Sequence, residues 1–298
     1  MAQDLYVITG ATGHIGHRVA EKLLAQNKKL RVIGRDANKL KALGDKGAEV
    51  FVGNVEKVDD MCRAFQGAKA VFLMIPPDYQ SDDFRKYQNR VSEAYEKAIR
   101  SSGVRYVVNL SSLGAHRSDK LGPINGLYDH EQRLNNIAGV HVVHLRPTYF
   151  MENHFNSLGL IKQAGINGSA MKGDVAIPQI ATADIAEVAA QYLTKLDFAG
   201  QVVHELLGPR DLSLQEATAI LGKAIGKPDL KYVQFSYEDT AKALMGMGFS
   251  KDVARLFNEM AKGFSEGLAS PTQGRGPKTT TPTTFEEFSK VLARAYQN

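Results

Sequence analysis

Three glycines near the N-terminus constrain the fold of this chain more than any other feature. Gly10, Gly13 and Gly16 follow an apolar run at residues 5–8 and precede a segment of helical periodicity at residues 18–24. Where a strand turns tightly into a helix, such glycines make the turn, let a phosphate approach the main chain and let the helix pack on the sheet. The free N–H groups and the dipole at the helix start then favour a pyrophosphate. An ordinary turn can carry the same glycines, so it is their position between strand and helix that favours a dinucleotide.

The first half of the chain alternates short β-rich runs with longer helical segments, which is typical of βαβ units and a parallel sheet. Right-handed crossovers then give a doubly wound α/β sheet with its ligand crevice at the carboxyl ends of the strands. We expect strands at residues 5–9, 30–33, 49–52, 70–75, 105–110 and 141–145, and one more at 201–207. Helices are expected at residues 14–26, 38–43, 57–65, 83–101 and 127–136, and later at 154–164, 182–196, 214–225, 238–247, 251–263 and 285–296.

The length of 298 residues exceeds the commonest size of one domain, about 100–150 residues. We therefore expect a Rossmann core over residues 1–150, completed by about 182–208, and a smaller, mainly helical substrate lobe formed by 151–181 and 209–298. The last helix has a capping box, in which Thr284 is followed three residues later by Glu287. Residues 270–283, rich in Pro, Gly and Thr, are interpreted as a linker, with a cover over the crevice as the alternative.

Composition narrows the class of partner. Apolar residues make up 43% of the chain and charged residues 23%, as in ordinary globular proteins. The formal net charge of +5 comes from 37 basic and 32 acidic residues that are dispersed along the chain, whereas a nucleic-acid-binding domain shows a clustered basic stripe. Cys62 is the only cysteine and cannot form an intrachain disulfide, no signal-peptide pattern is present, and no apolar run approaches about 18–20 residues. We expect a cytoplasmic protein that binds neither nucleic acid nor membrane.

The end of the second expected strand indicates which dinucleotide binds. Gly34 leaves space there, and Arg35 supplies a planar, bidentate donor that suits a 2′-phosphate. Asp36 would bind the ribose hydroxyls of NAD, but it is equally well placed to cap the next helix. We therefore expect NADP, with NAD as the alternative, while a solvated surface charge is the competing interpretation of Arg35.

Further cofactor contacts are expected wherever a strand ends. Asn54 would bond the adenine edge, Ile75 and Pro76 would line the middle of the nucleotide, and the serines after the fifth strand lie at the depth of the nicotinamide ring. A hydroxyl there would steady a substrate carbonyl or simply satisfy its own turn. The expected cofactor-binding residues are Gly10, Thr12, Gly13, His14, Ile15, Gly16, Arg35, Asn54, Ile75, Pro76 and Ser111, and Ser112 belongs to the expected catalytic residues.

The usual proton relay of short-chain dehydrogenases is missing. It needs a tyrosine with a lysine four residues later, because the cation lowers the pKa of the phenol. Four residues after Tyr128 the chain has Gln132, so carbonyl reduction by this relay becomes doubtful. His130 is a substitute donor candidate, although it lies on a different helix face from Tyr128 and a structural role competes. Tyr128 and His130 nevertheless complete the expected catalytic residues.

Several stretches resemble the NmrA-like branch of atypical short-chain dehydrogenases. The resemblance covers nearly the whole chain, and the Arg-Pro-x-x-Phe-x-Glu-Asn run that ends at Asn153 is more specific than the glycine motif. It implies a Rossmann core with a small C-terminal substrate lobe and NAD(P) bound through the glycines and Arg35. The branch includes NADP-sensing regulators, quinone and azo reductases, and reductases of plant phenolics. Asn54 stands where relatives often have aspartate, and residues 121–134 hold no replacement lysine. The stretches that carry the resemblance are residues 10–16, Arg35, 109–112, 145–153, 180–186 and the lead-in to the last helix.

Two functions remain open at this point. The first is a reductase that passes a hydride from NADPH to an electron-poor aromatic acceptor such as a quinone, a reaction that needs positioning more than a tuned acid. Tyr149 would line the acceptor site, and Asn153 either contacts the substrate or caps the following helix, while Glu152 would pair with a base. The alternative is a sensor whose nucleotide occupancy changes its affinity for a protein partner. A sugar-nucleotide epimerase is disfavoured, because that chemistry also uses the tyrosine-lysine pair.

Overall fold

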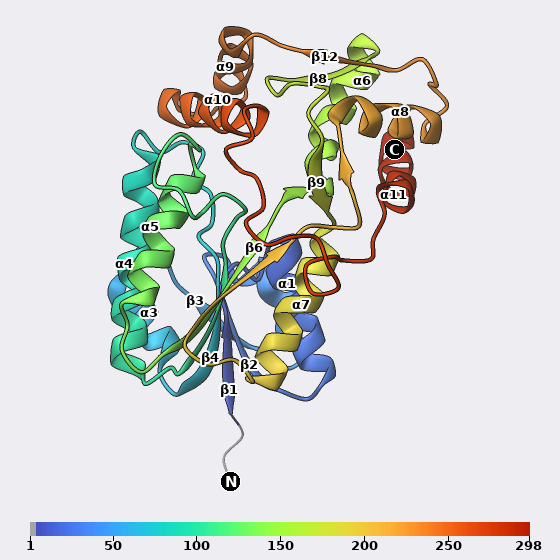
Figure 1. Cartoon of the computed structure of the whole chain (residues 1–298). Helices are drawn as coiled ribbons and strands as arrows, with labels where there is room; N and C mark the ends of the chain where they lie inside the picture. The colour runs from blue at the N-terminus through green and yellow to red at the C-terminus, as the bar shows by residue number, and fades with distance from the viewer. Residues whose placement is uncertain (1–3) are drawn as a thin grey trace.

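The computed structural model describes residues 4–298, and a seven-stranded, fully parallel sheet forms its centre (Figure 1). The strand order is β10-β6-β5-β4-β1-β2-β3, so the winding direction reverses next to β1. In such sheets the ligand crevice lies at this reversal, beyond the carboxyl ends of the strands. The strands are β1 (Leu5–Ile8), β2 (Lys29–Gly34), β3 (Glu49–Val52), β4 (Ala68–Leu73), β5 (Tyr106–Leu110), β6 (His141–Pro147) and β10 (Gln201–Leu206).

Helices cover both faces of the sheet, which explains why the strands read as continuous apolar runs. Tyr6 and Ile8 of β1 pack in one hydrophobic core, whereas Leu5 and Val7 pack in the core on the opposite face. The expected doubly wound α/β fold is thus confirmed. One face carries α1 (His14–Ala25), α2 (Ala37–Gly44) and α7 (Thr182–Lys195), and the other carries α3 (Val58–Phe65), α4 (Phe84–Ser102) and α5 (Ile124–Asn135).

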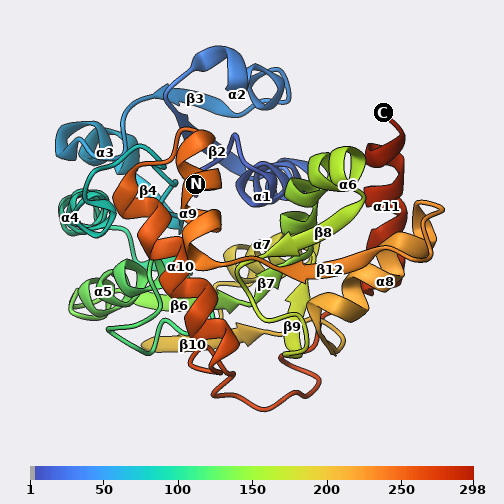
Figure 2. The same cartoon turned by 90° about the horizontal axis from the view of Figure 1, so that it is seen from above.

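The remaining elements form a smaller group above the carboxyl ends of the strands (Figure 1). Seen from above, α9 (Tyr237–Gly246) and α10 (Lys251–Ser265) lie on the side of α3–α5, whereas α6 (Leu158–Ala164), α8 (Leu214–Ala224) and α11 (Phe285–Gln297) lie together on the other side (Figure 2). This group is placed to cover the crevice. Its other elements are the 3₁₀ helix η1 (Met151–Ser157) and the short strands β7 (Tyr149–Phe150), β8 (Ile166–Ser169), β9 (Ile177–Ile180), β11 (Asp211–Leu212) and β12 (Lys231–Gln234).

The expected helices all exist, with ends shifted by a few residues, except that the segment 154–164 is divided between η1 and α6. The expected strands of the main sheet also exist. Two small sheets, β11-β9-β7 and β12-β8, were not expected from the pattern. The capping box of α11 is confirmed, because Thr284 accepts a hydrogen bond from the backbone N–H of Glu287, whose side chain in turn binds the backbone N–H of Thr284. The boundaries of the core and the lobe stay a prediction.

The connection between α10 and α11 is more than a linker. Its residue Thr272 donates its backbone N–H and its hydroxyl to the fully buried carboxylate of Glu205 on β10, and the N–H of Gln273 donates to the same carboxylate at 2.8 Å. The amide of Gln273 donates to the backbone oxygen of Val203 at 2.8 Å, and the N–H of Leu207 donates to Thr279. Because β10 is an edge strand, this connection satisfies backbone groups that would otherwise be open to a second chain.

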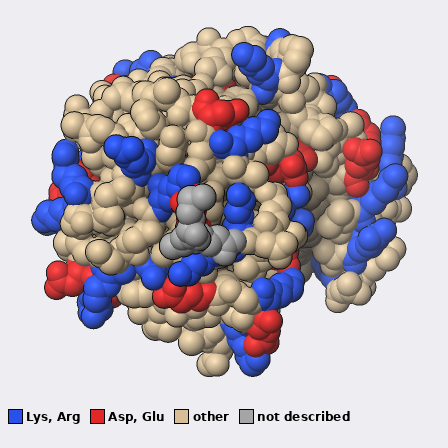
Figure 3. Space-filling model, turned by 90° about the horizontal axis from the view of Figure 1, so that it is seen from below, with Lys and Arg blue, Asp and Glu red and all other residues tan. Residues whose placement is uncertain are grey.

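Charges of both signs are interspersed on the face opposite the crevice (Figure 3). This distribution agrees with the dispersed excess of basic residues in the sequence. Within residues 4–298, no helix combines the length and the apolar character that crossing a bilayer requires.

Candidate nucleotide and acceptor site

The glycine turn between β1 and α1 builds an open cradle. Gly10 has a φ of +64°, and a side chain there would lie 2.5 Å from the sulfur of Met74. A side chain at Gly16 would lie 2.3 Å from the backbone oxygen of Gly10, so this glycine is required for helix and turn to meet. Gly13 precedes α1, and no side chain caps the helix start. A side chain at Gly13 would meet only the Gly10 oxygen, at 3.5 Å, so the space before the free N–H groups is open.

This cradle fits the pyrophosphate of a dinucleotide. The first turn of α1 has no acidic residue, so nothing offsets the positive end of the helix dipole. Thr12 and His14 are exposed at the helix start, whereas Ile15 is buried in the core and fixes the helix on the sheet. The hydroxyl of Thr9 accepts the N–H of Met74 at 2.9 Å, which ties the end of β1 to the end of β4. Sequence reasoning did not identify this contact.

Arg35 stands free at the end of β2. It is exposed, and the structure from residue 4 onward gives it no ion pair. Asp36, the residue that would compete for the ribose in an NAD site, accepts the N–H of Asn38 at 2.9 Å and caps α2. The capping interpretation of Asp36 is therefore confirmed. The guanidinium remains available to an anion.

The residues after β3 form a rigid turn. The amide oxygen of Asn54 accepts the N–H of Glu56 at 3.0 Å, and the backbone N–H of Asn54 donates to Asp60 at 2.9 Å. This backbone hydrogen bond lowers the pKa of Asp60, which desolvation opposes and the nearby Arg63 reinforces. The side-chain oxygen of Asn54 is thus used by its own turn, and within residues 4–298 its amide nitrogen has no hydrogen-bond partner.

The exit from β4 is held by two tyrosines of α4. Tyr95 donates its hydroxyl to the backbone oxygen of Met74 at 2.9 Å, and Tyr87 donates to that of Pro76 at 2.7 Å. Ile75 and Pro76 are half-buried between these anchors. They therefore lie at the strand end next to the glycine cradle, where the middle of a dinucleotide would pass.

A buried ionic network lies where β5 and β6 end. Ser111 donates its hydroxyl to Oε1 of Glu131 at 2.5 Å, and Arg146 donates Nε and Nη2 to the two carboxylate oxygens of Glu131 at 2.9 and 2.5 Å. Glu131 is 1% exposed and Arg146 is 7% exposed. The proton of Ser111 is therefore directed to Glu131, and its oxygen remains an acceptor. Sequence analysis missed Glu131. The one sequence feature that could have indicated its role is its position on the sheet-facing side of α5.

The neighbouring Ser112 is used differently. Its hydroxyl donates to the backbone oxygen of Leu113 at 3.0 Å, and the residue is half-buried. The interpretation of this serine as satisfying its own turn is therefore confirmed. Its proton is not directed at a substrate in this structure.

The two candidates on α5 have different surroundings. Tyr128 is half-buried and, among the described residues, has no hydrogen bond. His130 is fully buried, its Nδ1 lies 2.7 Å from the hydroxyl of Ser92 on α4, and burial lowers its pKa to about 3. His130 therefore faces α4 as a neutral group, and the expectation that it donates a proton to a substrate is wrong. Helix periodicity alone did not distinguish the face toward α4 from the face toward the crevice.

The residues after β6 lie at the junction with the lobe. Tyr149 is half-buried in β7, which pairs with β9. The carboxylate of Glu152 accepts hydrogen bonds from the backbone N–H of Thr182 at 3.0 Å and from the Thr182 hydroxyl at 2.5 Å. Glu152 therefore caps α7, and the expectation that it pairs with a base is wrong. Asn153 lies inside η1, and α6 begins later without a side-chain cap, so the expectation that Asn153 caps a helix is wrong. Its half-buried amide remains a candidate contact for a substrate.

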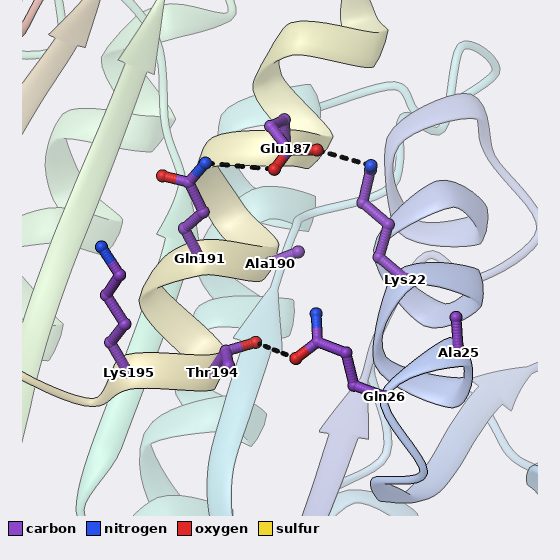
Figure 4. A pocket seen from close by; sticks show the side chains of 8 residues that line it. All are labelled: Lys22, Ala25, Gln26, Glu187, Ala190, Gln191, Thr194 and Lys195. Atoms are coloured by element: carbon purple, nitrogen blue, oxygen red, sulfur yellow. Dashed lines mark hydrogen bonds and ion pairs between the residues drawn. The ribbon is translucent and has the colours of Figure 1, made fainter.

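A groove of about 310 Å³ lies elsewhere, between α1 and α7 (Figure 4). Lys22 and Glu187 form an ion pair of 2.5 Å across it, and Thr194 donates to Gln26 at 2.9 Å. On α1, Lys22 and Gln26 lie about 12 and 18 Å along the axis from the helix start at a rise of 1.5 Å per residue. The groove is therefore remote from the crevice, and it is bridged by its own polar contacts.

The fold and the glycine cradle define a dinucleotide-binding protein of the doubly wound α/β class. A family model described as NAD(P)H-binding matches residues 10–195. The chain belongs to this NAD(P)H-binding family. The match begins at the first glycine of the cradle and ends at the last residue of α7.

Three comparisons are informative. The chain is 28% identical to the NAD(P)H azoreductase of Xenophilus azovorans over 301 residues, covering 98% of this chain and 99% of the relative. It is 27% identical to quinone oxidoreductase 2 of Escherichia coli over 265 residues, covering 88% and 89%. Among solved structures, the NADPH complex of an NADPH-dependent quinone oxidoreductase from Escherichia coli has a TM-score of 0.80 at 26% identity, covering 96% and 99%.

Proposed function

We propose that this protein is an NADPH-dependent reductase that passes a hydride to a quinone-like or other electron-poor aromatic acceptor. The observation that carries the proposal is the contrast within one crevice. The phosphate cradle at Gly13 is open, whereas the tyrosine-lysine relay is missing and His130 is enclosed. A reduction that relies on positioning fits this arrangement, and the azoreductase and quinone oxidoreductase relatives support it.

The chain's residues have three tasks in this reaction. The glycine cradle binds the pyrophosphate, and the Ser111 oxygen, held by Glu131, is placed to accept a hydrogen bond from the nicotinamide end. Ile75 and Pro76 line the path between them. NADPH supplies the hydride when it is bound, and water can supply the remaining proton. Rate enhancement then comes from holding donor and acceptor in register, which removes translational and rotational freedom before the step.

We propose NADPH over NADH because Arg35 is exposed without an ion pair and Asp36 is engaged at the start of α2. A guanidinium binds a phosphate with two parallel hydrogen bonds. The NADPH complex of the similar Escherichia coli structure supports this choice. Within the NAD(P)H-binding family, we further propose that the chain belongs to the NmrA-like branch, because of the run from Arg146 to Asn153.

We also propose that residues 151–181 and 209–298 act as the substrate lobe, because they lie above the carboxyl ends of the strands (Figure 1). The acceptor would lie between this lobe and the β5–α5 connection. Apolar residues from both sides already form one cluster there, which includes Ala115, Leu127, Met171 and Tyr232.

Steady-state consumption of NADPH with a panel of quinones tests the function. We expect turnover with quinones, and a lower kcat/KM with NADH than with NADPH. A Gly16→Val variant is the negative control, because its side chain collides with the Gly10 backbone and disrupts the cradle. Turnover that never exceeds the rate of this control with any acceptor would overturn the proposal.

A further inference from the structure

Tyr149, like Tyr128, makes no hydrogen bond through its hydroxyl within residues 4–298, in contrast to three other tyrosines of the fold. Tyr87 and Tyr95 donate to backbone oxygens after β4, and Tyr232 donates to a backbone oxygen of the lobe. Within residues 4–298 the Tyr149 hydroxyl has no hydrogen-bond partner, and it is not among the fully enclosed polar atoms that lack one. Since a buried tyrosine hydroxyl normally finds a partner, this hydroxyl remains free to donate to a ligand.

The ring of Tyr149 is fixed where α5 meets the elements above the sheet. It packs in the cluster that Leu127 of α5 and Met171 of the lobe share, with an edge-on contact of 5.7 Å to the ring of His154. β7 starts two residues after Pro147, whose backbone oxygen accepts the N–H of Leu113 at 2.8 Å. Tyr149 therefore lies beside the start of the β5–α5 connection, where the serines end β5.

The protonation state suits a hydrogen-bond donor. Burial raises the pKa of the Tyr149 hydroxyl, and the neighbouring Tyr232 adds to the shift. The phenol therefore keeps its proton at neutral pH. A short-chain dehydrogenase tyrosine has the opposite requirement, because its lysine must lower the pKa for proton transfer.

We propose that the Tyr149 hydroxyl donates a hydrogen bond to the carbonyl oxygen of the acceptor, an inference that rests on the proposed reduction of quinone-like molecules. Tyr149 is then a catalytic residue, since it stabilises the negative charge that develops on this oxygen. A donor that is already oriented in a partly water-free site is effective for this purpose, because it needs no reorganisation during the reaction.

The step balances without a protein acid. NADPH, when bound, supplies the hydride, and the quinone takes up this hydride and one proton from water to give NADP⁺ and the hydroquinone. Tyr149 keeps its proton throughout and releases the reduced acceptor once water has protonated the oxygen.

A Tyr149→Phe variant tests the proposal, because it keeps the ring in its cluster and removes only the hydroxyl. We expect kcat with a quinone to fall about ten- to a hundredfold, the loss typical of one hydrogen bond to a charged oxygen. The Kd for NADPH, measured by the fluorescence of the reduced nicotinamide, and the thermal midpoint should stay at wild-type values. Wild-type kcat in Tyr149→Phe would overturn the proposal, as would a parallel loss of NADPH affinity or thermal stability.

Tyr192→Phe on α7 is the matched control, because Tyr192 packs against a different core from the acceptor cluster. Its hydroxyl lies 3.1 Å from Nδ1 of His204 on β10, so its removal should lower the thermal midpoint but leave kcat unchanged. A loss of kcat equal to that of Tyr149→Phe would show that the effect is not specific to the Tyr149 hydroxyl and would overturn the proposal. If the wild-type protein reduces no quinone, the proposed function itself fails, which distinguishes the two conclusions.

Discussion

The guanidinium of Arg146 and the carboxylate of Glu131 form a bidentate ion pair, with bonds of 2.9 and 2.5 Å, between β6 and α5. Both side chains are buried, and the hydroxyl of Ser111 completes the coordination of the carboxylate. Removing two charges from water is costly, so the pair is weak evidence for added stability. Its effect is positional, because it fixes α5 against the end of β6 and directs the proton of the Ser111 hydroxyl to Glu131.

A Glu131→Gln substitution should strongly destabilise the fold. The neutral amide leaves the Arg146 charge buried without a counter-charge, which costs about 3–5 kcal/mol in comparable pairs. Urea unfolding monitored by circular dichroism would measure the change in the free energy of unfolding. Glu93→Gln on α4 is the control, because Glu93 is 54% exposed and 3.6 Å from Arg133, and such a pair contributes about 0–1 kcal/mol. Equal effects of the two substitutions would contradict the ionic network.

Gly13→Val should separate nucleotide binding from folding. The backbone at Gly13 is extended, with φ of −96° and ψ of 169°, so a side chain is sterically allowed there. It would however fill the space before the free N–H groups of α1. We expect the Kd for NADPH to rise at least about tenfold, since one lost charge-assisted contact to a phosphate already accounts for that factor. The thermal midpoint should change little.

Gly159→Ala is the control for this substitution. Gly159 lies in α6 with no atom within 4 Å of an added methyl group. Alanine there should leave NADPH affinity unchanged and stabilise the helix by about 0.5–1 kcal/mol. If Gly13→Val binds NADPH as tightly as the wild type, the cradle is not the pyrophosphate site.

Arg35→Gln should change the choice of cofactor. Loss of the guanidinium removes the bidentate partner of a 2′-phosphate, so the Kd for NADPH should rise about tenfold while that for NADH stays constant. Fluorescence titration with both nucleotides measures this. Arg100→Gln, far along α4 and paired with Glu96 at 3.0 Å, should affect neither affinity. A loss of affinity shared equally by NADPH and NADH would show that Arg35 does not recognise the phosphate.

The sequence predicted the main sheet because burial on both faces makes its strands continuous apolar runs. It did not predict β7 and β9, which have two and four residues and pair only through the tertiary fold. The glycine cradle was recognisable since its spacing is local. The role of Glu131 was not recognisable from the sequence, because its partner Arg146 is 15 residues away and only the orientation of α5 brings the two side chains together.

His130 also shows that the sequence predicts a residue's place in a helix better than it predicts what the residue packs against. Its position in the helix was predicted, yet the sequence could not tell that the face carrying it packs on Ser92. Tyr149 was expected in the acceptor site from its place after β6. Its unpartnered hydroxyl, by contrast, is a property of the packed structure.

Stability should fall with acidification below about pH 6.5, because buried histidines resist protonation in the folded state. Burial lowers the pKa of His154 and of His144 to about 4, from an unfolded value of 6.5. Below pH 6.5 the histidines of the unfolded chain take up protons that those of the native chain cannot. The stability that these histidines contribute is therefore complete above pH 6.5, is lost progressively as the pH falls, and is gone near pH 4. The urea midpoint measured across this window should decrease. His154 Nε2 lies 3.0 Å from Gln179 Oε1, and the amide of a His154→Gln variant can keep this hydrogen bond. The urea midpoint of this variant should therefore decrease less than that of the wild type. A midpoint that stays constant from pH 6.5 to 4 in the wild type would contradict the buried neutral state.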